Sequence, residues 1–146
     1  MLIPYTAENF EIYNSYVTIE YADEYFSKQF GENWSSFTDT AIKERLLVSA
    51  SSLIDNEKLS DSKFDAGQNM EFPRGDGIIP MPIKYATCEL AVLIHENDGI
   101  HFERSPEKVS FQGAVTIENE DNRPYNKVIR ALLLPFVERR VSLERG

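Results

Sequence analysis

Residues 80–94, Pro80-Met81-Pro82-Ile83-Lys84-Tyr85-Ala86-Thr87-Cys88-Glu89-Leu90-Ala91-Val92-Leu93-Ile94, decide the fold class of this chain. Pro82 suits the first turn of a helix, where a missing backbone N–H costs nothing. The segment Asn97-Asp98-Gly99 supplies a stop signal after it. Between these signals the apolar side chains recur at helical spacing and form a stripe of Ile83, Ala86, Leu90, Leu93 and Ile94. Thr87 and Cys88 lie on the flank of this stripe. The sequence therefore predicts a helix here.

A helix is also predicted closer to the N-terminus. Thr18 can cap a helix that runs to about Phe30, and Gly31 stops it. The inner stripe of this helix is Ala22, Tyr25, Phe26, Gln29 and Phe30. The residues before it, 1–17, are expected to be extended. Trp34 and Phe37 follow it, and we expect both to fill the core.

A further helix is predicted from Thr38 or Thr40 to about Asp55, with Asp39 at the positive end of its dipole. Its apolar stripe is Ile42, Leu46, Leu47, Ala50, Leu53 and Ile54. Residues 56–70 are polar and predict a loop, and the glycines and proline of residues 72–77 fit no regular element.

Beyond residue 105 the apolar period changes to two, which predicts a short β-hairpin over about residues 106–119. Its apolar positions are Val109, Phe111, Val115 and Ile117. Pro124 starts a last helix, and Pro135 must end or kink it by Leu134 because proline costs about 3 kcal/mol inside a helix. Residues 136–140 are then expected to form a separate turn that points elsewhere.

These elements predict a mainly α fold: a bundle of three to four helices with one short β-hairpin and an extended N-terminal segment. At 146 residues the chain is most simply one domain, with residues 1–122 as the bundle and 123–146 as a C-terminal docking helix and tail. A single cysteine fits a reducing compartment. The opening residues have neither a basic n-region nor a long apolar run, so we expect no secretory signal and no membrane span.

Charge is divided unevenly along the chain. Residues 123–146 carry a formal charge of +4, whereas the other 122 residues carry −13. The basic segment is also apolar at helical spacing, which suits docking onto an acidic surface of a neighbouring copy or of a partner. The residues predicted to dock on a partner or on a neighbouring subunit are Val128, Ile129, Leu132, Leu133, Phe136, Arg139 and Arg140. The alternative is that this segment packs on its own domain as a last helix. Both can hold at once, with one half of the segment packed on its own domain and the other half docked on a partner.

Groupings that carry chemistry are scarce in the sequence. His95 and His101 do not have the i, i+4 spacing of a helical metal pair, and Cys88 with His95 lacks an evident orienting partner. The carboxylates lie in helix-surface or turn contexts, and no glycine loop is followed by a phosphate-binding lysine. We therefore expect no enzyme, no metal and no cofactor.

Three stretches, in order and spacing, resemble one protein family. They are residues 14–26, from Asn14-Ser15-Tyr16-Val17-Thr18 into the first helix, then Phe72-Pro73-Arg74, then Ile79-Pro80 with residues 82–91. The family is that of the head–tail connector, or adaptor, proteins of tailed bacteriophages, and the resemblance covers about residues 13–95. Some members carry the label "DnaT-like single-stranded DNA-binding protein".

This resemblance implies a structural virion protein that forms a ring, typically of twelve copies, beneath the portal protein. Its partners would be the portal, neighbouring copies and a tail or head-completion protein, with the hairpin as a contact device. Genomic double-stranded DNA would pass through the channel without specific binding. The location would be the virion, and the host cytoplasm during assembly.

Two other functions remain open from the sequence. A single-stranded DNA-binding replication protein would have to use its basic tail, because a chain with net charge −9 repels phosphates. An enzyme or metal protein would most plausibly use Cys88 with His95. An acidic body, by contrast, suits a channel wall along which DNA must slide without sticking.

Overall fold

The computed structural model describes residues 1–29, 34–37, 39–96 and 127–137. This part of the chain is mainly helical, with four α-helices: α1 (Ile19–Ser27), α2 (Thr40–Asp55), α3 (Met81–Glu96) and α6 (Lys127–Leu133). Two 3-10 turns, η1 (Trp34–Ser36) and η4 (Leu134–Phe136), accompany them. The described residues contain isolated β-bridges but no extended strand, which confirms the predicted fold class. The predicted hairpin, residues 106–119, lies outside the described residues.

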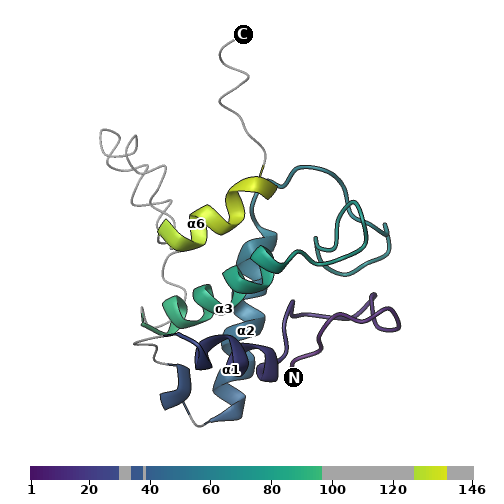
Figure 1. Cartoon of the computed structure of the whole chain (residues 1–146). Coiled ribbons are helices and arrows are strands. Elements are labelled where there is room, and N and C mark those ends of the chain that lie inside the picture. Colours follow the sequence, from purple (N-terminus) through teal and green to yellow (C-terminus); the bar gives the residue numbers. More distant parts are fainter. Residues whose placement is uncertain (30–33, 38, 97–126, 138–146) are drawn as a thin grey trace, which may run out of the picture.

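α3 is the central layer of the bundle. α6 lies on one side of it and α1 on the other, while α2 crosses behind (Figure 1). Because neighbours cover α3 on more than one face, Thr87 and Cys88, on the flank of the predicted stripe, are fully buried. No helix in the described segments is both long and apolar enough to cross a lipid bilayer.

The helix starts follow the predicted caps. The Thr18 hydroxyl accepts a hydrogen bond from the Tyr21 N–H at 3.0 Å, and the Asp39 carboxylate accepts one from the Ala41 N–H at 2.9 Å. α1 ends at Ser27, earlier than predicted, so Gln29 is exposed and does not continue the buried stripe.

Aromatic residues close the lower end of the bundle, as expected for Trp34 and Phe37. Trp34 is buried and stacks on Phe26 at 5.4 Å between ring centroids, and its indole N–H donates to Asp23 at 2.7 Å. The hydroxyl of Tyr25 donates to the Glu89 carboxylate at 2.6 Å, which ties α1 to α3.

The N-terminal segment folds back on itself, although the sequence predicts an extended one. The Asn14 carboxamide oxygen accepts from the Ile3 N–H at 2.7 Å, and the Ile3 carbonyl accepts from the Asn14 N–H at 2.8 Å. A parallel bridge pairs Pro4 with Ser15. These bonds hold residues 1–17 as an arm beside the start of α1.

The last described residues stay on the bundle, which corrects the expectation that the chain points elsewhere after Pro135. The Phe136 ring meets Phe72 at 5.8 Å, and its carbonyl accepts from the Ser60 N–H at 2.9 Å. Val137 forms an antiparallel bridge with Leu59. As predicted, the α-helix itself ends before Pro135.

Candidate interaction site

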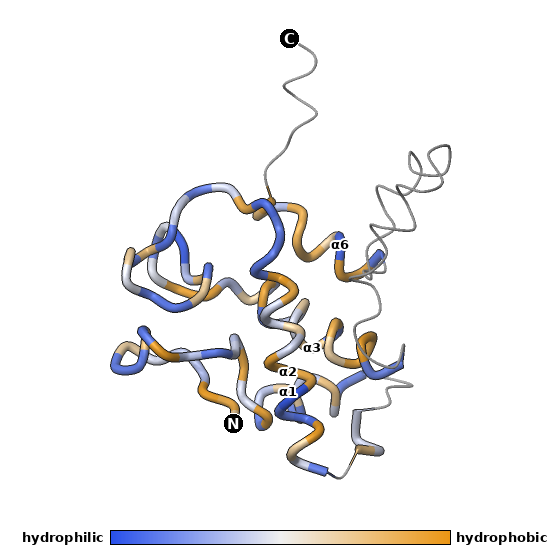
Figure 2. The backbone as a smooth tube through the Cα atoms, turned by 180° about the vertical axis from the view of Figure 1, so that it is seen from behind, coloured by the Kyte–Doolittle hydropathy of each residue, from blue (hydrophilic) through white to orange (hydrophobic). Residues whose placement is uncertain are grey.

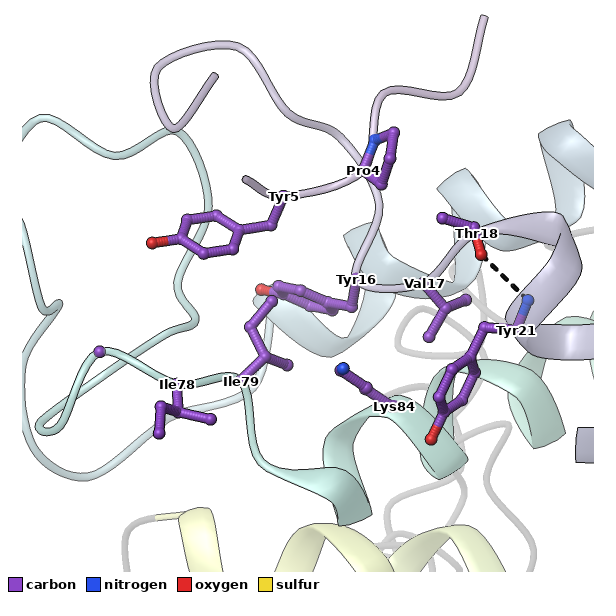
Figure 3. Close-up of a pocket in the computed structure, with 10 residues that line it drawn as sticks. Pro4, Tyr5, Tyr16, Val17, Thr18, Tyr21, Ile78, Ile79 and Lys84 are labelled. Carbon is purple, nitrogen blue, oxygen red and sulfur yellow. Dashed lines mark hydrogen bonds between the residues drawn. The ribbon is translucent and has the colours of Figure 1, made fainter. Parts of the chain in front are cut away.

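A pocket of about 340 Å³ opens between the N-terminal arm, the start of α1 and the loop that leads into α3 (Figure 3). The backbone bonds of the arm place Pro4 and Tyr5 along one wall, and Thr18 and Tyr21 come from the first turn of α1. The pocket is lined by Pro4, Tyr5, Tyr16, Val17, Thr18, Tyr21, Gly77, Ile78, Ile79 and Lys84. Its position depends on three segments that are far apart in the sequence.

The pocket walls are aromatic and aliphatic, with one cation. Lys84 holds its ammonium 5.2 Å from the centroid of the Tyr21 ring, a cation–π geometry (Figure 3). Burial raises the pKa of the Tyr21 phenol, so the ring stays neutral beside the lysine. Such a pocket can hold an apolar or aromatic group, but it does not bring together an acid and a base.

Beneath this pocket, Tyr16 and Asp55 join the end of α2 to the loop before α3. The Tyr16 hydroxyl donates to the Asp55 carboxylate and accepts from the Phe72 N–H at 3.2 Å. Burial raises the pKa of Asp55 to about 6, while its bonds from Tyr16 and from the Glu71 N–H oppose that rise. A carboxyl with a raised pKa is frequent at active sites, but here it is satisfied by structural partners.

Tyr13 extends the same network. Its hydroxyl lies against the carbonyls of Met70 and Phe72, and its ring meets Tyr5 edge-on at 5.0 Å. The side chain of Asn69 donates to the Tyr13 carbonyl at 2.6 Å. The buried polar side chains of the described residues all have hydrogen-bond partners, so this network is complete.

Arg74 organises the 56–80 connection from within. Its guanidinium pairs with Glu71 at 2.6 Å and donates to the carbonyls of Ser60, at 2.7 Å, and Asp61. Only 11% of its side chain is exposed. Because its donors are engaged inside the loop, Arg74 holds the fold of the connection.

The structure divides the docking residues predicted from the C-terminal segment. Ile129 and Leu133 are buried against α3 in the chain's own core, and Leu132 and Phe136 are half-buried. Val128 is 53% exposed and remains available to a partner. Arg139 and Arg140 lie outside the described residues, as do the hairpin positions Val109, Phe111, Val115 and Ile117. Docking by this set therefore remains a prediction, and it can rest only on the members that are not buried.

An exposed apolar pair that the sequence did not single out lies on the 56–80 connection. Phe64 is 54% exposed and Ile78 is 65% exposed. In the sequence Phe64 is a lone apolar residue in a polar stretch, whereas Ile78 is followed by the buried Ile79. Figure 2 shows this connection as short alternating hydrophilic and hydrophobic runs. An isolated Phe in a polar loop was the one signal that could have found this surface.

Cys88 and His95 do not form a reactive pair in this geometry. Cys88 is fully buried in α3, and burial raises the pKa of its thiol, which keeps the sulfur protonated. His95 is exposed, with its ring 4.2 Å from that of Phe37. Among the described residues, no group of three or more His, Cys, Asp or Glu side chains could hold a metal ion.

Comparison with known protein families gives a match along the chain. The model of the family described as "Putative DnaT-like ssDNA binding protein" matches residues 3–146. No curated protein and no solved structure matches the chain. Since the match spans almost the whole sequence, including both the arm and the C-terminal segment, this chain belongs to that DnaT-like family.

Proposed function

We propose that this protein is a structural adaptor of a tailed bacteriophage, one subunit of a ring that sits beneath the portal, extends the DNA channel and joins the capsid to the tail. The proposal starts from the ordered resemblance of residues 14–26, 72–74 and 79–91 to head–tail connectors.

One observation carries the proposal furthest: these three stretches meet in a single buried network. Tyr16 from the first stretch packs edge-on against Phe72 from the second, at 5.7 Å between centroids. Ile79 and Ile83 from the third belong to the same apolar core. The residues that carry the resemblance thus pack in the core and hold the fold together. This is the role expected of them in a structural protein, which needs no catalytic residues.

The charge distribution supports the same function. The chain has net charge −9, and acidic residues at the surface of the arm, α1 and the 56–80 connection remain exposed. A negatively charged channel wall does not bind a DNA duplex, because non-specific binding requires Lys and Arg side chains that displace the counterions of the phosphates.

Electron microscopy of the protein mixed with the portal protein encoded in the same genome tests this function. We expect a ring of density added to one face of the portal, and a subunit that co-sediments with it. A protein that stays monomeric and ignores the portal at micromolar concentrations contradicts the proposal.

The description of the family favours a second candidate, binding of single-stranded DNA. The pocket with Tyr5, Tyr21 and Lys84 offers aromatic rings beside a cation, and stacking of a base on an aromatic ring contributes about 1–3 kcal/mol. Against it, the acidic body opposes the approach of phosphates.

Fluorescence anisotropy with a labelled oligo-dT at low and moderate salt separates the two candidates. Submicromolar binding that weakens with salt and is lost in Lys84→Ala or in Arg130→Ala/Arg139→Ala/Arg140→Ala supports the DNA-binding function. Absence of such binding, together with a ring on the portal, supports the adaptor.

A further inference from the structure

Two exposed surfaces of the described chain have complementary character. The first, which we name the loop patch, consists of Phe64 and Ile78 with the carboxylates of Asp61, Asp65 and Asp76. The second, which we name the outer face of α6, consists of Lys127, Val128 and Ala131 of α6 with Leu134 of the η4 turn that follows it. Both expose large apolar side chains, and adjacent apolar exposure with a polar rim is typical of interaction sites.

The loop patch is assembled by backbone pairing. Isolated antiparallel bridges pair Lys63 with Arg74 and Arg74 with Ile78, so three segments of the loop lie side by side. Gly77, at φ +83°, lets the Phe64 ring approach so closely that a Cβ there would lie 2.9 Å from it. Because Arg74 fixes these segments from within, the patch exists before any partner binds.

The exposed charge on the patch is negative. Asp61, Asp65 and Asp76 are exposed, whereas the two cations of the same segments face inward. The Lys63 ammonium is half-buried, 3.4 Å from the Gln68 carbonyl, and Arg74 is paired with Glu71. A partner approaching Phe64 and Ile78 therefore meets carboxylates around an apolar centre.

The outer face of α6 has the opposite sign. Val128 is 53% and Leu134 is 54% exposed, and Lys127, the first residue of α6, is exposed as well. Ile129 and Leu133 anchor the inner face in the core against α3. This anchor fixes the rotation of α6, so Val128 stays on the exposed side of the helix.

We propose that the outer face of α6 of one copy binds the loop patch of a second copy, with Val128 and Leu134 against Phe64 and Ile78, and Lys127 among the three aspartates. The contact joins two different surfaces, so one copy keeps its loop patch free and the other keeps its α6 face free. Such a heterologous contact repeats from copy to copy and closes into a ring or runs on as a filament. The inference rests on the proposed adaptor function and identifies the neighbouring copy as the partner of both surfaces.

Site-specific crosslinking of the full chain tests this contact. The single native cysteine, Cys88, is fully buried, so a cysteine pair introduced at the surface reacts alone. We expect Phe64→Cys/Val128→Cys, treated with a short bismaleimide at high protein concentration, to give a ladder of dimers, trimers and larger species on a denaturing gel. A mixture of the two single variants should give dimers only, since each copy then carries one reactive surface.

Ile12→Cys/Val128→Cys is the matched control, because Ile12 is 60% exposed but belongs to neither surface. Replacing Asp61, Asp65 and Asp76 with asparagine in the Phe64/Val128 pair should reduce the trimer band at least threefold in low salt. A ladder that is no stronger than that of the Ile12 control overturns the inference.

The outcome is separable from that of the adaptor proposal. If rings form on the portal while the Phe64/Val128 pair gives no ladder, the adaptor function stands and this interface is wrong. If the ladder forms while the protein ignores the portal, the interface stands and the adaptor function is contradicted.

Discussion

α3 and the 56–80 connection border the same core, but different interactions hold them. Along α3, Ile83, Ala86, Leu90 and Ile94 are buried aliphatic side chains that need only the right size and spacing. In the connection, Gln68 and Arg74, with Asp55 from the end of α2, satisfy backbone groups that no helix or sheet satisfies. The comparison shows that a loop can be as defined as a helix when polar side chains replace the missing backbone partners.

The largest effect is expected from the helix. Leu90→Ala should lower the free energy of unfolding by about 2–5 kcal/mol, because it removes buried methyl groups and leaves a cavity in a layer covered on several faces. Urea denaturation followed by circular dichroism measures it. Ile12→Ala, on the exposed arm, is the control and should change stability by less than about 0.5 kcal/mol. Equal losses in both variants would contradict the central position of α3.

The next effect concerns pH and belongs to Asp55, the last residue of α2, whose carboxylate accepts from the backbone of the connection. The pKa of Asp55 is raised from 3.8 to about 6 in the folded chain, so the folded state binds its proton more tightly than the unfolded state does. The contribution of this carboxyl is therefore full below about pH 4 and is lost as the pH rises through 6. We expect the stability of the wild type relative to Asp55→Asn to fall between pH 4 and pH 7 by on the order of 2 kcal/mol.

Urea titrations of the two proteins at half-unit pH steps check this window. Parallel stability curves from pH 4 to pH 7 would show that Asp55 is not held in the environment described for it. Above about pH 7 the two curves should again run parallel, because the carboxyl is then ionised in both the folded and the unfolded state.

A smaller loss is expected from Arg74→Lys. A lysine keeps the charge but cannot reach Glu71 and the Ser60 and Asp61 carbonyls together, as the planar guanidinium does. We expect a loss of about 1–2 kcal/mol, measured by urea denaturation. Lys28→Ala removes a fully surface-exposed pair with Glu24 and should cost less than about 0.5 kcal/mol. If Arg74→Lys left the free energy of unfolding unchanged, the connection would not depend on the several N–H donors of the guanidinium group.

The smallest effect on stability is expected at Gly77. Alanine at φ +83° is strained by about 1 kcal/mol, and its methyl group must displace the Phe64 ring. The larger consequence is for the loop patch: in an Ile78→Cys/Val128→Cys pair, which keeps the Phe64 ring, Gly77→Ala should weaken the crosslinked ladder. An unchanged ladder would show that the loop patch does not depend on the fit of the Phe64 ring against Gly77.

Sequence reasoning succeeded where local signals act over a few residues. Thr18 caps α1, Asp39 caps α2, and Pro135 ends α6, each because one side chain or ring acts on the backbone of its own turn. The apolar stripes predicted most of the cores of α2 and α3 for the same reason, since helical periodicity is a local property. Ile42, the first member of the α2 stripe, is the exception, because it is 37% exposed.

It failed where the partner is distant in sequence. Tyr13 and Tyr16 meet residues 70–72, more than fifty positions away, and nothing near either tyrosine indicates that contact. The same holds for Phe136, which the break at Pro135 suggested would leave the bundle but which packs on Phe72. The candidate pocket has three contributors of this kind, so it could not be read from any one stretch.

By itself, then, the sequence determined the helices, the starts of α1 and α2, the end of α6, the uneven distribution of charge and most of the apolar stripes, because each depends on neighbouring residues or on composition alone. Only the tertiary structure decided which apolar residues remain outside. Ile129 and Leu133 are buried because α6 packs on α3, whereas Phe64 and Ile78 are exposed on a loop that Arg74 fixes. The physical reason is that burial belongs to the packed arrangement: a side chain is hidden only when another segment covers it, and the covering segment here comes from elsewhere in the chain.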